Sequence, residues 1–168
     1  MSSETAWNKG QLFSSKNHDW ETPKDLFSEV NREFNFDLDA AASAENAKVD
    51  SFLTIEDDSL SVDWSLKGRV IWLNPPYGRG IGQWIKKAYC ESVKGCTVVV
   101  LTMVRSDTKW WCEWAMRAAE IRLIEGRVHF RRGEETGGAP APSALLVFDE
   151  NRRIPQFKQV KLPRGTTK

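Results

Sequence analysis

The chain has 168 residues, with 24 basic and 23 acidic side chains and a net charge of +1, and its length predicts a single domain with a sizeable core. The near-zero charge excludes a polyanion-binding protein that acts through overall charge, so any nucleic-acid surface must come from local clusters of basic residues. Two histidines, three cysteines without C-x-x-C spacing, no signal peptide and no long apolar run argue against zinc and a membrane span, and predict a cytoplasmic protein.

The first part of the chain predicts one helix and two short strands. Residues 1–19 are polar and irregular, and we expect a flexible N-terminal segment. A helix is predicted over residues 22–34, with Thr22 as N-cap, Pro23 at N1 and Asp25 at N3. Strands are predicted at 36–41 and, more weakly, at 52–54.

The second part alternates strands with helices. Strands are predicted at 70–73, 97–104, 121–124 and 143–148, and helices at 81–94, ending before Gly95, and from Asp107 to about Ala119. Residues 131–142 read as a mobile Gly/Pro-rich loop. We therefore predict an α/β fold in one domain over residues 20–150, followed by a basic tail over 151–168. Its sheet is expected to be mostly parallel, with helices on both faces and a late antiparallel hairpin at one edge.

The tetrad Asn74-Pro75-Pro76-Tyr77 follows the predicted buried strand 70–73 and is suited to activating a conjugated amine. The lone pair of such an amine is delocalised into its ring unless acceptors pull the N–H groups out of the ring plane. The Asn74 side-chain oxygen and the Pro75 carbonyl are two such acceptors. Neither Pro75 nor Pro76 has an N–H that competes, and Tyr77 offers a face for stacking. The alternative is a Pro-Pro turn beside a core tyrosine, but ligands of α/β proteins usually lie at strand ends, which favours the catalytic interpretation.

The chain also resembles the phage-type DNA N6-adenine methyltransferases, the phage Dam family, from Trp20 to Phe148. The resemblance lies in five segments taken in order: Trp20-Glu21-Thr22-Pro23, Asp37-Leu38-Asp39-Ala40-Ala41, Glu56-Asp57-Asp58-Ser59-Leu60, Leu73-Asn74-Pro75-Pro76-Tyr77-Gly78 and Gly126-Arg127-Val128-His129-Phe130. It implies a Rossmann-like fold, S-adenosylmethionine as methyl donor and adenine in double-stranded DNA as acceptor. The Gly-rich loop of the wider methyltransferase class is missing, and residues 37–42 replace it.

Candidate cofactor residues come from the first three of these segments. Asp39, at a strand end in the motif that begins with Asp37, is placed to meet the cationic amino-acid end of the cofactor. Trp20, Thr22 and Pro23 flank a helix N-terminus, which attracts a carboxylate. Asp58, or its neighbour Asp57, is a candidate acceptor for the adenine amine of the cofactor. The alternatives are a loop carboxylate, a plain helix cap and a solvated acidic surface.

Candidate DNA-binding residues lie after the strand ends. Phe130 is a candidate to stack on a flipped-out base opposite Tyr77, unless it is a core aromatic residue. A phosphate track is predicted from six basic residues, each of which is alternatively a surface charge: Arg79, Arg105, Lys109, Arg127, Arg131 and Arg132. Few residues follow the last predicted strand, so we expect no separate recognition domain. The DNA sequence is then recognised by loops at residues 6–19, 78–82, 105–112 and 131–142.

Two other functions use the same features. Enzymes that methylate RNA bases or protein glutamine amides also carry this tetrad, because an amide and an aryl amine pose the same electronic problem. A non-catalytic DNA-binding module with a vestigial pocket is consistent with the missing Gly-rich loop. The family resemblance favours DNA methylation, with no metal, and suggests escape from host restriction as its use.

Overall fold

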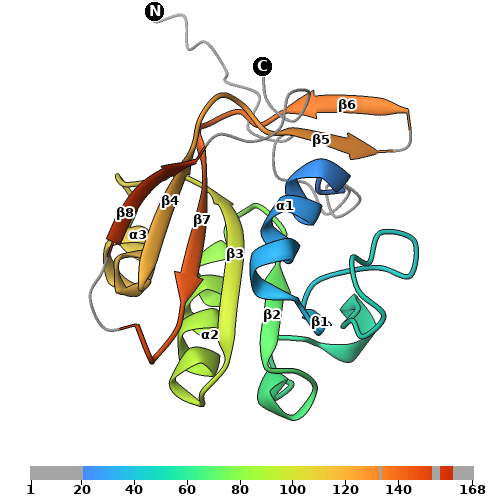
Figure 1. The fold of residues 1–168 in the computed structure, drawn as a ribbon, viewed down its shortest axis with the longest axis vertical. Helices are drawn as coiled ribbons and strands as arrows, with labels where there is room; N and C mark the ends of the chain where they lie inside the picture. Colours follow the sequence, from blue (N-terminus) through green and yellow to red (C-terminus); the bar gives the residue numbers. More distant parts are fainter. Residues whose placement is uncertain (1–20, 133, 153–155, 161–168) are drawn as a thin grey trace, which may run out of the picture.

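The computed structural model describes residues 21–132, 134–152 and 156–160, and its first element is helix α1, Lys24–Phe34 (Figure 1). The helix forms because Leu26, Phe27 and Val30 share one buried face. It ends where Asn35 adopts a left-handed conformation with φ 55°. The predicted N-cap is wrong by one residue: Pro23 precedes the first turn, and its carbonyl accepts the N–H of Phe27 at 3.0 Å.

A six-stranded, mostly parallel sheet forms the centre of the molecule, which confirms the predicted α/β class. Its strand order is β1 (Leu38–Asp39), β2 (Val70–Leu73), β3 (Thr97–Met103), β7 (Ser143–Phe148), β4 (Glu120–Ile124) and β8 (Gln156–Val160). Only β7 runs against the other strands of this sheet. The predicted strand at 52–54 is reduced to a single bridge between Phe52 and Asp39.

The late strands are arranged differently from the prediction. Strands β4 and β7 do pair antiparallel, but β7 lies between β3 and β4, not at an edge. The edge is formed by β8, which arises from a segment where no element is expected. Ile121 of β4 pairs in register with Phe157 of β8. The pattern missed β8 because most of its residues are exposed and polar, as is usual for an edge strand.

A separate two-stranded sheet replaces most of the predicted mobile loop. Strands β5 (His129–Arg132) and β6 (Glu135–Gly138) pair antiparallel and form what we call the hairpin. Figure 1 shows the hairpin standing apart from the six-stranded sheet, above α1. The prediction of a loop over 131–142 is therefore wrong for residues 131–132 and 135–138.

The remaining helices are α2 (Ile81–Val93) and α3 (Lys109–Glu113). The first agrees with the prediction, and Gly95 follows its end with φ 91°, a conformation that favours glycine. The second is much shorter than the predicted 107–119. It begins after Thr108 and gives way to a 3-10 turn at Ala115–Arg117. Two more 3-10 turns, Ile55–Asp57 and Trp64–Leu66, lie in the connection between β1 and β2.

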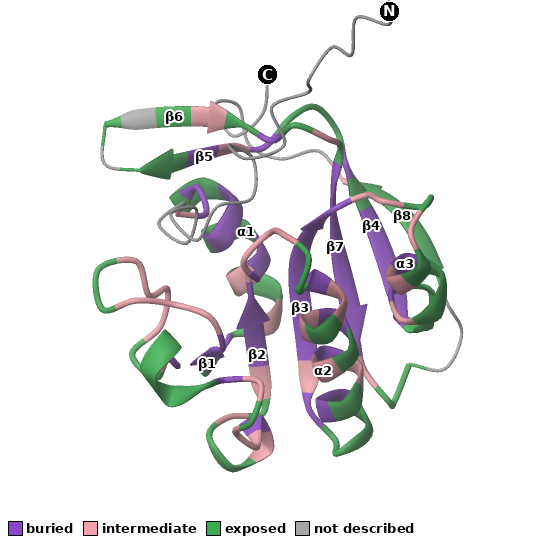
Figure 2. Ribbon diagram, turned by 180° about the vertical axis from the view of Figure 1, so that it is seen from behind, coloured by how far each residue is buried: buried purple, intermediate pink, exposed green. Residues whose placement is uncertain are grey.

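Alternate residues of the central strands enter two different apolar clusters, as the twofold periodicity of a strand requires. Val98 and Val100 of β3 pack with Ile85 of α2, whereas Val99 and Leu101 pack with Leu26 of α1. Figure 2 shows that β3 and β7 are buried along almost their whole length. Each fully buried aliphatic side chain contributes about 1.5–3 kcal/mol, so the central strands give a rigid base for the residues at their ends.

Candidate active site

The tetrad lies at the end of β2, where the chain leaves the sheet. Strand β2 ends at Leu73, and β3 continues beyond the position paired with it. Tyr77 turns back toward this extension: its hydroxyl lies 3.2 Å from Oδ1 of Asn74 and 3.4 Å from the carbonyl oxygen of Leu101. Burial raises the pKa of the Tyr77 phenol, so the hydroxyl remains a donor. The predicted acceptor Oδ1 is thus already bonded in this structure.

A cavity of about 550 Å³ opens beside the tetrad. This volume is in the usual range for sites that bind small molecules and cofactors. The cavity is bordered by the loop after β1, by the acidic segment after Phe52, by the tetrad and by α2. The lining residues are Ala40–Glu45, Leu53–Glu56, Asp58–Leu60, Asn74–Tyr77 and Trp84. We call it the main cavity.

The acidic segment presents Asp58, and not Asp57, to the main cavity. The Asp57 carboxylate accepts the N–H and the hydroxyl of Thr54, at 2.7 and 2.9 Å, and these bonds lower its pKa. Asp58 adopts φ 46°, and its carboxylate accepts the Ser61 hydroxyl at 2.7 Å. The buried Ser59 hydroxyl donates to the carbonyl of Ala40 at 2.6 Å, which holds the segment against the end of β1.

A smaller cavity of about 30 Å³ adjoins the main cavity and contains Asp39. Its lining residues are Glu21, Thr22, Asp39, Ala41, Asn46, Lys48, Trp72 and Asn74. Ala41 and Asn74 border both cavities. Asp39 is 3% exposed, and its carboxylate accepts the N–H groups of Ala41 and Lys48 at 3.3 and 3.1 Å. Burial raises the pKa of Asp39 to about 6, which favours a cationic ligand group beside it.

Glu21 and Lys48, which form an ion pair, are among the residues of the smaller cavity that the sequence analysis missed. The Nζ atom of Lys48 lies 2.6 Å from Oε1 of Glu21, and the Lys48 side chain is only 8% exposed. Lys48 stands in a short polar stretch, and Glu21 lies in the segment of residues 20–23 with no role assigned to it. Their contact joins positions 27 residues apart, and no local pattern in the sequence signals it.

Three other predicted cofactor residues are not brought to the cavities. The Asp37 carboxylate accepts the N–H groups of Arg69 and Val70 at 2.9–3.0 Å and so fixes the start of β2. Asp37, Asp57 and Pro23 do not border either cavity in the described part of the chain. Trp20 and the predicted reading segment 6–19 lie outside the described residues.

Phe130 reaches the tetrad from the hairpin. Its ring centroid lies 6.0 Å from that of Tyr77, and the rings are inclined at 70°. The structure brings the two aromatic residues together, and Phe130 is also buried in the apolar cluster around α1, as the core alternative requires. They contact each other edge to face, so a base that stacks between them requires the rings to separate.

The six predicted phosphate contacts lie after the carboxyl ends of three strands, and two of them, Arg131 and Arg132, are on β5 of the hairpin. They follow β2, β3 or β4 in the chain, and these three strands run in the same direction. All are exposed except Arg105, which is half-buried. Nε of Arg105 lies 3.4 Å from Oδ1 of Asp107, and Nζ of Lys109 lies 3.5 Å from Oε1 of Glu113. Part of the positive charge after β3 is therefore offset locally.

Within the described ranges, no cluster of three or more His, Cys, Asp or Glu side chains is arranged to hold a metal ion. The same ranges contain no helix with the length and apolar character needed to cross a membrane.

Known proteins match most of this chain. The family model for DNA N-6-adenine-methyltransferase (Dam) matches residues 9–163. The DNA N-6-adenine-methyltransferase of Haemophilus phage HP1 is 37% identical over 137 residues, which cover 77% of this chain and 78% of the relative. The enzyme of the same name from Escherichia phage T1 is 35% identical over 107 residues, covering 63% and 44%. A putative methyltransferase of Escherichia coli K12, YfdM, is 41% identical over 64 residues, covering 34% and 69%. The chain therefore belongs to the DNA N-6-adenine-methyltransferase (Dam) family.

Proposed function

We propose that this chain transfers a methyl group from S-adenosylmethionine to N6 of an adenine that is flipped out of double-stranded DNA. The observation that carries this proposal is the position of Asn74 and Tyr77 at the end of β2, on the border of a cavity of about 550 Å³. Family membership supports the reaction. The two apolar clusters, one with α1 and one with α2 and α3, support a Rossmann-like arrangement with helices on both faces of the sheet.

We assign the two cavities to the two ends of the methyl donor. S-adenosylmethionine supplies an electrophilic methyl group when it is bound. Asp58 accepts a hydrogen bond from its adenine amine in the main cavity. Asp39 receives its ammonium group in the smaller cavity, where that carboxylate is otherwise bonded to backbone N–H groups. Thr22, which is buried and borders the smaller cavity just before α1, lies beside its carboxylate.

Asn74 and Pro75 activate the target amine. The Oδ1 atom of Asn74 and the carbonyl oxygen of Pro75 each accept a hydrogen bond from one N6–H group. These bonds draw the N6 lone pair out of conjugation with the ring. The same oxygens stabilise the positive charge that grows on N6 during the transfer. N6 then loses one proton to water, which leaves neutral N6-methyladenine. Tyr77 stacks on the target base. At Oδ1 of Asn74, the base competes with the Tyr77 hydroxyl.

The hairpin and the neighbouring loops contact the DNA. Arg79 follows β2, Arg127 follows β4 and Arg131 lies on β5 of the hairpin. All three are exposed, and such residues bind phosphates. A two-stranded β ribbon also fits the width of the major groove. We propose that the hairpin replaces the expected loop as the reading element, together with residues 78–82 and 105–112. Protection of phage DNA from host restriction is the use we propose for the methylation.

Expression in a methylation-free bacterial host, followed by single-molecule sequencing of the host DNA, tests this function. We expect N6-methyladenine at one short recurrent sequence, and none in cells that express Asn74→Ala at the same level. Purified protein is then given labelled S-adenosylmethionine with DNA, RNA or a release-factor protein. Label on RNA or protein, with none on DNA, would show that DNA is not the substrate. The absence of transfer to all three by folded protein would refute the proposed methyltransferase activity.

A further inference from the structure

Glu21 contacts two different parts of the protein, one through its backbone and one through its side chain. Its backbone pairs with Arg131 of β5: the Glu21 N–H donates to the Arg131 carbonyl at 2.7 Å, and the Arg131 N–H donates back at 3.1 Å. Its side chain accepts from Nζ of Lys48 at 2.6 Å. One residue therefore contacts both the hairpin and the wall of the smaller cavity.

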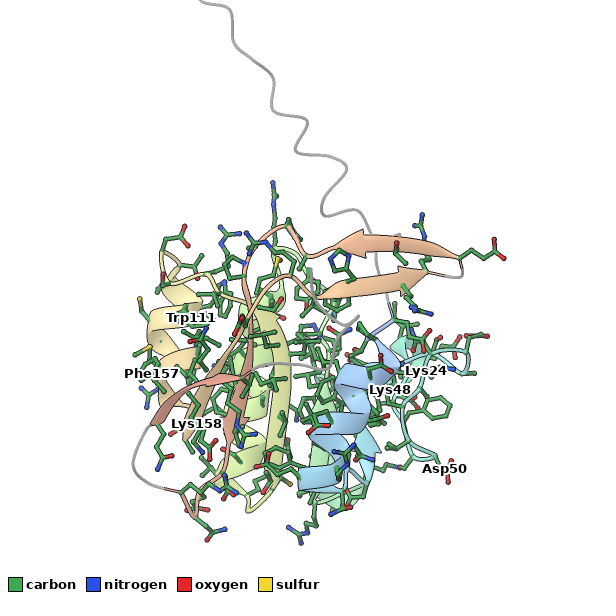
Figure 3. The ribbon with its side chains drawn as sticks, turned by 45° about the horizontal axis from the view of Figure 1, so that its top comes forward. Lys24, Lys48, Asp50, Trp111, Phe157 and Lys158 are labelled. Atoms are coloured by element: carbon green, nitrogen blue, oxygen red, sulfur yellow. The ribbon has the colours of Figure 1, made fainter. Side chains whose placement is uncertain are left out.

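Lys48 lines the smaller cavity and can contact a ligand bound in it. Its own N–H donates to Oδ2 of Asp39, and Figure 3 shows its side chain close to the start of α1. Among the described residues that line the two cavities, Lys48 alone carries a positive side-chain charge. An ammonium group has three donors. A carboxylate of a bound ligand therefore finds a second partner in Lys48 while the bond to Glu21 is kept.

The hairpin is held to the core by Phe130, which is buried in the apolar cluster around α1. Within the described ranges the hairpin shares no strand pairing with the six-stranded sheet, and Glu21 pairs with it from the body of the protein. Arg131 is exposed on it, and Phe130 contacts Tyr77 from it. The position of the hairpin therefore affects both the outer surface and the contact at the tetrad.

We propose that Glu21 is a positioning residue that couples occupancy of the smaller cavity to the hairpin, an inference that rests on the proposed function. A ligand carboxylate fixes the Lys48 ammonium between two carboxylates, Lys48 fixes the Glu21 side chain, and the Glu21 backbone holds Arg131. Binding of the methyl donor thus orders the hairpin before DNA arrives. The coupling is reciprocal, because a hairpin held by DNA favours the same position of Lys48.

Hydrogen exchange of the hairpin measures this coupling without any DNA. The probe is S-adenosylhomocysteine at saturation, with binding followed by calorimetry, and the readout is amide exchange over residues 129–138. In the wild-type protein we expect the ligand to slow this exchange by roughly fivefold or more, the lower end of usual coupling between sites. In Glu21→Gln, which keeps the backbone pairing and removes the charge, we expect less than about a twofold change.

Two further variants make the result specific. Lys48→Gln and the double variant Glu21→Gln/Lys48→Gln should lose the coupling to the same extent, since both residues act through one contact. The double variant also removes both charges of the pair, so neither charge is left unpaired. Glu29→Gln, which breaks an exposed ion pair with Arg32 on α1, is the matched control and should keep the wild-type response.

The outcomes separate this inference from the proposed function. Ligand binding by the wild type with no slowing of hairpin exchange overturns the coupling alone, and so does an equal slowing in Glu21→Gln. The absence of S-adenosylhomocysteine binding by folded wild-type protein overturns the proposed function, and the coupling with it.

Discussion

The hydroxyl of Tyr77 donates to Oδ1 of Asn74 at 3.2 Å, so one tetrad residue occupies the acceptor that another tetrad residue offers to the target amine. The same hydroxyl lies 3.4 Å from the Leu101 carbonyl. This arrangement satisfies the buried end of Tyr77 when no base is bound. It also means that an entering adenine amine competes with the Tyr77 hydroxyl for Oδ1 of Asn74.

Tyr77→Phe removes the competing donor and keeps the ring. A hydrogen bond of this kind contributes about 0.5–1.5 kcal/mol net, so we expect the KM for DNA to fall by roughly two- to tenfold, with kcat little changed. Tyr77→Ala, which also removes the stacking face, should lose methyl transfer while its circular dichroism stays that of the wild type. Steady-state kinetics on unmethylated DNA distinguish the two. Equal losses in both variants would show that the hydroxyl takes part in the chemistry.

The raised pKa of Asp39 predicts a pH-dependent affinity for the methyl donor. Burial raises this pKa to about 6, and only the ionised carboxylate attracts an ammonium group. We therefore expect the Kd of S-adenosylhomocysteine to be constant above pH 7 and to rise by about tenfold for each pH unit below 6. Calorimetry between pH 5 and 8 measures it. Asp39→Asn should bind weakly at every pH, and a flat wild-type profile would remove Asp39 from the ammonium site.

The same ionisation opposes folding. The pKa of Asp39 in the folded protein is above its ordinary value of 3.8, so the folded state binds the proton more tightly than the unfolded state does. Its contribution to stability is present below about pH 4 and is lost as the pH rises through 6, a change of roughly 3 kcal/mol. Urea unfolding of wild type and Asp39→Asn, below about pH 4 and above about pH 6, measures this difference in the free energy of unfolding. We expect the variant to gain stability relative to wild type as the pH rises, and no relative change would contradict the burial argument.

Asp57 and Asp58 are adjacent and should respond differently to the same change. Asp58 borders the main cavity, so Asp58→Ala should raise the KM for S-adenosylmethionine by about tenfold or more, through loss of a charge-assisted hydrogen bond. Asp57 caps the turn at Ile55 through Thr54, so Asp57→Ala should lower the melting temperature slightly and leave this KM near the wild-type value. Initial rates and thermal unfolding of both variants provide the comparison. A larger KM effect in Asp57→Ala would reverse the assignment.

The elements that could be predicted are those in which local pattern and burial agree. Val98 to Leu101 are apolar without interruption, and this is the signature of a central strand that is covered on both faces. The spacing of Ile81, Ile85 and Ala88 gave α2, and the tetrad was expected at a strand end. In these segments the residues that define the element are also the residues that bury it.

The hairpin and β8 were missed for a related reason. Gly137 and Gly138 pair with Phe130 and His129, and glycines in a polar context read as a loop. Only residues 133 and 134 connect Arg132 to Glu135, and a Gly-Glu pair at that point is a turn signal that was available. Strand β8 is specified by pairing with β4. The ion pair of Glu21 and Lys48 depends on the three-dimensional fold, so no local rule predicts it.

The single-turnover rate of methyl transfer by Asn74→Ala, relative to wild type, tests most directly whether acceptor oxygens at the end of β2 activate the target amine. Asn74 is half-buried at the cavity border, so the variant should fold normally and retain its affinity for S-adenosylhomocysteine. We expect the rate on the mapped DNA site to fall by about 10²–10³-fold, as on loss of one preorganised group that stabilises transition-state charge. A folded, ligand-binding Asn74→Ala protein that transfers methyl groups at the wild-type rate would contradict this mechanism.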